Sequence, residues 1–172
     1  MAVGRRATIH VCALALAIFF TCPSQAQVMG EEAELNRLRA KAEEAMGNED
    51  AEGAAMNMGR AALMAAQLSK RYTDPVLKQT YSAAEHLYRS QEHGYRAVAL
   101  FRRAGGELPA SAGVCGSLQL GQLELNHVQT ALDPPQMVPD EASRIRMKPL
   151  QEAADDWAIV LGSMRAEYHC PS

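Results

Sequence analysis

Apolar residues and alanines recur every three or four positions along most of this chain, and this spacing most constrains its fold. Such steps place side chains on one face of an α-helix, whereas a half-buried strand needs alternation of period two. No stretch of the sequence shows sustained period-two alternation of β-branched residues. The last helical stripe is the clearest and consists of Leu150, Ala153, Trp157, Val160 and Met164. The chain is therefore predicted to be all-α.

Glycines, prolines and capping residues divide the pattern into six amphipathic helices. Asn48 or Asp50 is the expected N-cap of the second helix, and Asp74 is the expected N-cap of the third, directly before a proline. Gly94 is interpreted as the turn between the third and fourth helices, which lie close together in the sequence. The expected helices cover about 31–46, 50–72, 77–92, 97–104 and 118–132, and a last one that begins between 140 and 149 and ends near 168. Short connections between them predict antiparallel neighbours.

The N-terminus has the three parts of a secretory signal peptide. Arg5 and Arg6 supply a positive start, and residues 11–20 form an apolar run too short to span a bilayer. Pro23 and the small-x-small sequence Ser24-Gln25-Ala26 follow, which predicts cleavage before Gln27. Residues 1–26 are thus the expected signal peptide, and residues 27–172 the expected single helical domain.

Two alternatives for the N-terminus remain open. The apolar run could stay attached as a membrane anchor, or Cys22 could carry a lipid. A lipoprotein signal resembles Leu-x-(Gly/Ala)-Cys, and the residues before Cys22 are Phe19-Phe20-Thr21, which fit that pattern poorly. No later apolar run is long enough for a second membrane segment. We therefore expect a periplasmic or secreted bacterial protein without an integral membrane segment after cleavage.

The signal peptide also decides which cysteines remain. Cys12 and Cys22 leave with it, and Cys115 and Cys170 stay. A single pair of cysteines in an exported chain is most simply a disulfide. If the last two helices pack antiparallel, Cys115 before one of them lies beside Cys170 after the other. The bridge is therefore predicted to close a C-terminal hairpin over residues 115–170.

The charge of the chain argues against nucleic acid as a partner. The formal net charge is −3 for the whole sequence, and it becomes −5 when Arg5 and Arg6 are removed with the signal peptide. Binding to nucleic acid depends on basic residues that neutralise phosphates. An acidic chain without a basic run does not have this property.

A 34-residue period links Pro75 and Pro109, and this is the length of a tetratricopeptide repeat. Residues 78–111 resemble one such repeat, with departures at Ala84 and Glu85. The matching positions are Tyr81, Tyr88, Ala97, Phe101, Ala104 and Pro109. The resemblance implies antiparallel helical hairpins stacked as a short array of such repeats. A plain helical bundle is the alternative.

The same resemblance implies a non-catalytic scaffold or adaptor that binds a protein or peptide. Residues on the inner face of the first helix of such a repeat usually contact the ligand, which indicates Lys78, Glu85 and Arg89. Three helix pairs are about the minimum for a self-supporting array. Formation of a homo-oligomer, or docking on a larger assembly, is therefore plausible.

A metal- or haem-binding helical bundle is the alternative function. His86 and His93 lie seven residues apart, and Glu124 and His127 have the Glu-x-x-His spacing of half a di-iron motif. A haem would need axial ligands such as methionine and histidine. The candidates for these are Met56, Met58, Met64 and His169. Each pattern lacks the further ligands that such a site needs, so no metal and no cofactor is predicted.

Overall fold

The computed structural model describes residues 25–132 and 141–171, and these residues form five α-helices and no strand. The helices are α1 (Gln25–Gly47), α2 (Ala51–Arg71), α3 (Pro75–Arg103), α4 (Ala112–Leu132) and α5 (Glu141–Glu167). The predicted all-α class is confirmed. Most of the predicted signal peptide, with Cys22, and the proline-rich connector 133–140 lie outside the described residues.

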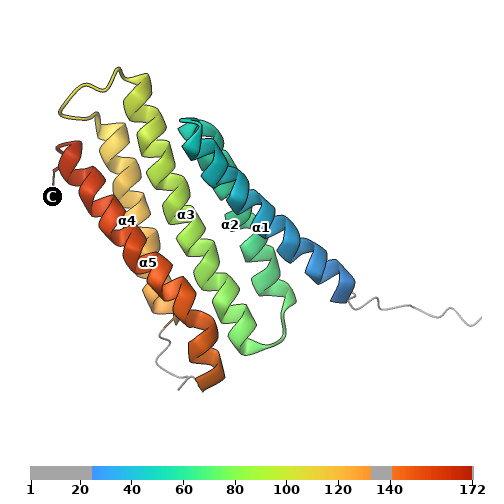
Figure 1. The fold of residues 1–172 in the computed structure, drawn as a ribbon. Helices are drawn as coiled ribbons and strands as arrows, with labels where there is room; N and C mark the ends of the chain where they lie inside the picture. The colour runs from blue at the N-terminus through green and yellow to red at the C-terminus, as the bar shows by residue number, and fades with distance from the viewer. Residues whose placement is uncertain (1–24, 133–140, 172) are drawn as a thin grey trace, which may run out of the picture.

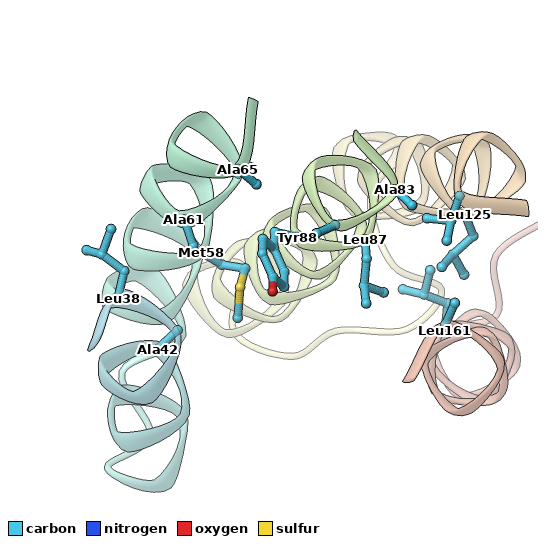
Figure 2. Close-up of a cluster of buried hydrophobic side chains, with 14 of the residues drawn as sticks. Leu38, Ala42, Met58, Ala61, Ala65, Ala83, Leu87, Tyr88, Leu125 and Leu161 are labelled. Carbon is cyan, nitrogen blue, oxygen red and sulfur yellow. The ribbon is translucent and has the colours of Figure 1, made fainter. Parts of the chain in front are cut away.

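The long helix α3 lies at the centre of the molecule. α1 and α2 form a hairpin on one side of α3, and α4 and α5 form a second hairpin on its other side (Figure 1). Viewed along the helices, α2, α3 and α4 lie in a row, and α1 and α5 pack on the same face of that row (Figure 2). The two hairpins therefore both depend on α3.

Local signals in the sequence fix several helix ends. The Asp50 side chain accepts a hydrogen bond from the Gly53 N–H at 2.8 Å, and the Asp74 side chain accepts from Val76 and Leu77 at 2.8 and 2.9 Å. Both residues are the N-caps that the sequence predicts. After α3, Gly105 and Gly106 adopt φ angles of 80° and 73°, which residues with a Cβ rarely reach.

The predicted turn at Gly94 is wrong, because α3 runs without interruption from Pro75 to Arg103. A single glycine does not end a helix when the helix packs against its neighbours at that position. Gly94 is buried, and a Cβ built on it would lie 2.5 Å from Cζ2 of Trp157 on α5. The glycine thus lets the α5 indole approach the backbone of α3. Residues 78–111 consequently hold one helix and the loop after it, in place of the helix pair expected there.

The first predicted helix also begins earlier than expected, at Gln25. Between Pro23 and Glu31 the sequence contains no residue other than Gly30 that opposes a helix. The last predicted helix agrees with α5, which begins at Glu141 and includes Pro149. Among the described residues, no helix has the combination of length and apolar character that crossing a membrane requires.

The core differs on the two sides of α3. Towards α4 and α5 it is built from large side chains, and Leu87, Leu125 and Leu161 from three helices converge there (Figure 2). On the α1–α2 side it contains more small side chains, of which Ala42, Ala61 and Ala65 are 0% exposed, beside the larger Leu38 and Met58. Small side chains allow these two helices to pack closely, and the leucines fill the wider space on the other side.

The predicted disulfide is present and joins Cys115 to Cys170. Cys115 was expected just before α4. It lies instead in the first turn of this helix, because α4 already begins at Ala112. Two further contacts hold the end of α5 at the same place. The Tyr168 carbonyl accepts a hydrogen bond from the Ala110 N–H at 3.0 Å, and the Tyr168 ring stacks on Phe101 with a centroid separation of 4.2 Å.

Candidate functional site

A groove of about 630 Å³ runs between α2 and α3, and residues of these two helices alone line it. We call it the α2/α3 groove. Its small and apolar residues are Ala55, Met56, Gly59, Leu63, Ala99 and Leu100. Its charged residues are Glu52, Arg60, Arg89, Glu92, Arg96 and Arg103. A volume of this size lies within the range of natural ligand sites, which is about 300–1,000 Å³.

The apolar part of the groove is open to solvent. Met56 is 55% exposed and Leu63 is 56% exposed, although both belong to a helix whose other face is buried. Between them, Gly59 lets the Glu92 side chain lie directly against α2, since a Cβ on Gly59 would be 2.9 Å from the Glu92 carboxyl carbon. The groove therefore combines exposed apolar side chains with a charged side chain held close to the backbone.

Three arginines follow one another along the α3 side of the groove. Arg89, Arg96 and Arg103 are seven residues apart, which places them almost on one line of the helix surface. Each is paired with a glutamate. Arg89 Nη2 lies 3.1 Å from Glu85 Oε1, Arg96 pairs with Glu92, and Arg103 Nη2 lies 2.9 Å from Glu52 Oε1. The line of guanidinium groups is thus paired with three glutamates, of which Glu92 is 16% exposed and Glu52 is 75% exposed.

The structure brings two of the three predicted binding residues together. Glu85 and Arg89 are hydrogen-bonded to each other, and Arg89 lines the α2/α3 groove. Lys78 is exposed near the start of α3 and does not line the groove. The three residues share one helical face by their spacing. Their role in binding a partner stays a prediction.

Most of this groove was not predicted from the sequence, because a turn was assigned to Gly94. With a break there, Arg89 and Arg96 belong to different helices and their spacing of seven has no meaning. In a continuous helix, the same spacing predicts a line of arginines. On α2, Met56, Arg60 and Leu63 are spaced four and three residues apart. This spacing indicates a second stripe on α2, which faces outward, beside the buried one.

Two of the histidine patterns meet between α3 and α4. His86 Nδ1 lies 2.7 Å from Glu124 Oε2, and the His86 and His127 rings have centroids 5.1 Å apart. The described residues nevertheless contain no group of three His, Cys, Asp or Glu side chains arranged to hold a metal ion. The contact therefore joins α3 to α4 as a hydrogen-bonded pair with a neighbouring ring.

The other candidate ligands are dispersed over the fold. His93 is half-buried, and burial lowers the pKa of its imidazole. Its carbonyl accepts a hydrogen bond from Ser117 Oγ at 2.9 Å. Met58 is 2% exposed in the core, whereas Met56 faces the groove and His169 follows the end of α5. The structure does not bring these methionines and His169 to one place.

Comparison of the chain with protein-family models, with curated proteins and with solved structures gives no match.

Proposed function

We propose that this protein is exported and acts as a non-catalytic binding protein, holding a segment of another protein in the α2/α3 groove. The observation that carries the proposal is the exposure of Met56 and Leu63, 55% and 56%, inside a groove with a charged rim. Exposed apolar side chains surrounded by polar ones are typical of interaction sites. A helix or strand of a partner that covered them would remove this apolar surface from water.

Export to the periplasm or beyond the cell is part of the same proposal. It is supported by the arrangement of residues 1–26 as a signal peptide and by the Cys115–Cys170 disulfide, since disulfides persist in oxidising compartments. Cell fractionation followed by mass spectrometry of the intact protein tests it. The expected product begins at Gln27 and is found outside the cytoplasm. A full-length or cytoplasmic product contradicts export.

Site-specific photo-crosslinking tests the groove itself. A photoreactive amino acid is placed at Leu63 in the groove or, as the matched control, at Ile159, which is 70% exposed on α5. We expect a discrete cross-linked adduct in source cells from position 63 and none from position 159. Equal adducts from both positions, or none from position 63, would contradict binding in the groove.

A further inference from the structure

The net charge of the residues that line the α2/α3 groove is opposite in sign to the net charge of the whole chain. Four arginines and two glutamates line the groove, whereas the complete sequence has a formal net charge of −3. The groove is thus locally basic on an acidic protein. A local potential of this kind attracts a segment of negative charge.

Two of the four arginines, Arg60 and Arg103, can turn to a new partner at little cost. Arg60 is exposed and has no hydrogen-bond or ion-pair partner among the described residues. The Arg103–Glu52 pair is open to solvent, with side chains 64% and 75% exposed, and such surface pairs contribute little to stability. A guanidinium group binds a carboxylate through two parallel hydrogen bonds, which makes arginine well suited to recognise acidic side chains.

We propose that the α2/α3 groove selects an acidic amphipathic peptide segment, with its apolar side chains on Met56 and Leu63 and its carboxylates on the arginines. This inference rests on the proposed function and specifies the chemistry of the partner. The exposed apolar side chains between the charged residues favour a peptide over a nucleic acid. A nucleic acid would gain most from many unpaired basic residues, and the groove has an excess of only two positive charges.

Fluorescence anisotropy with three labelled peptides tests the selection, using the disulfide-bonded chain 27–172. The peptides share the same leucines at helical spacing and carry glutamate, glutamine or lysine at all other variable positions. We expect the glutamate peptide to bind at least tenfold more tightly than the glutamine peptide, and the lysine peptide to bind most weakly. Raising the salt concentration should reduce this difference, since the charges are solvent-exposed.

Substitution of arginines inside and outside the groove tests whether the groove causes the preference for the glutamate peptide. The double variant Arg60→Gln/Arg103→Gln should weaken binding of the glutamate peptide about tenfold and leave the glutamine peptide almost unchanged. Arg37→Gln is the control, because Arg37 on α1 is also an exposed arginine paired with a nearby glutamate, Glu34. It should have no effect on either peptide.

Three results would overturn the proposal: equal binding of the three peptides, no binding of the glutamate peptide, or tighter binding of a single-stranded oligonucleotide than of that peptide. Its failure can be told apart from failure of the groove function. A photoreactive amino acid at Met56, which also lines the groove, gives the readout for this comparison. If Leu63→Asp abolishes its cross-link to the cellular partner while the arginine substitutions do not weaken it, the groove binds a partner that is not selected for acidity. If no position in the groove gives a cross-link, the groove function itself fails.

Discussion

Gly94 shows how a single side-chain position controls the packing of two helices. A Cβ at this position would lie 2.5 Å from Trp157 Cζ2 and 3.2 Å from Leu161 Cδ2, closer than atoms in a packed core normally approach. Gly94→Ala must therefore push α5 away from α3. We expect it to lower the free energy of unfolding by about 1–3 kcal/mol, the usual cost of overpacking a core. Urea unfolding followed by circular dichroism measures this.

Gly162 is the matched control for this substitution. It lies within α5, and a Cβ built on it has no neighbour within 4 Å. Gly162→Ala should therefore raise the free energy of unfolding by about 0.5–1 kcal/mol, because alanine has the higher helix propensity. A Gly94→Ala variant that is stabilised like Gly162→Ala would show that helix propensity, and not the contact with Trp157, dominates at position 94.

At the scale of secondary-structure elements, the Cys115–Cys170 disulfide determines how firmly α5 is attached. The bridge spans a sequence separation of 55 residues and lies at the end of the molecule where α4 begins and α5 ends. Restricting a loop of this length in the unfolded chain adds about 4 kcal/mol to the free energy of unfolding in the chain-entropy model. We expect the double variant Cys115→Ser/Cys170→Ser to lose stability of this order in urea unfolding. A reducing agent should destabilise the wild-type chain and leave the variant unchanged, and equal midpoints for both proteins would contradict the prediction.

The sequence predicts some elements well because their signals are local. Asp50 and Asp74 cap helices through their own backbone neighbours, and Gly105-Gly106 supply the positive φ angles that end α3. The disulfide could also be predicted, because the antiparallel packing of two adjacent helices leaves one place for it. Gly94 could not be assigned in this way. Whether a glycine ends a helix or lies at a crossing depends on Trp157, which is 63 positions later in the chain.

The spacing of residues indicates the two stripes that line the candidate groove, but not that both stay uncovered in the fold. Of its residues, Arg89 alone was selected from the sequence as a partner-binding residue, on the basis of a repeat pattern whose helix pair the structure does not contain. Met56 was considered only as a haem ligand. The groove depends on which faces of α2 and α3 remain uncovered after α1, α4 and α5 have packed. Burial of this kind follows from the whole arrangement of helices and not from the spacing within any one of them.

On the scale of the whole molecule, α3 connects two sides that have different anchors. On the α1–α2 side, Glu32 accepts hydrogen bonds from the hydroxyl groups of Tyr72 and Tyr81, the latter at 2.6 Å, and so joins α1 to α3. The hydrogen bond to Glu32 and, above all, burial raise the pKa of Tyr81. On the α4 side, the buried Ser90 hydroxyl donates to the Gly121 carbonyl at 2.8 Å.

We expect these two anchors to contribute independently to the stability of a molecule that unfolds in a single transition. Tyr81 and Ser90 are nine residues apart, about 13 Å of helical rise along α3, and they share no hydrogen-bond partner. Glu32→Ala and Ser90→Ala should each lower the free energy of unfolding by about 1–2 kcal/mol, since each removes hydrogen bonds between helices. Because contributions from distant sites add, the double variant should lose the sum of the two to within about 0.5 kcal/mol, in a single urea transition seen equally by circular dichroism and tryptophan fluorescence. A coupling energy between the two substitutions above about 1 kcal/mol would show that the anchors are not independent. Two separate transitions would show that the continuous helix α3, from Pro75 to Arg103, does not join the two hairpins into one unfolding unit.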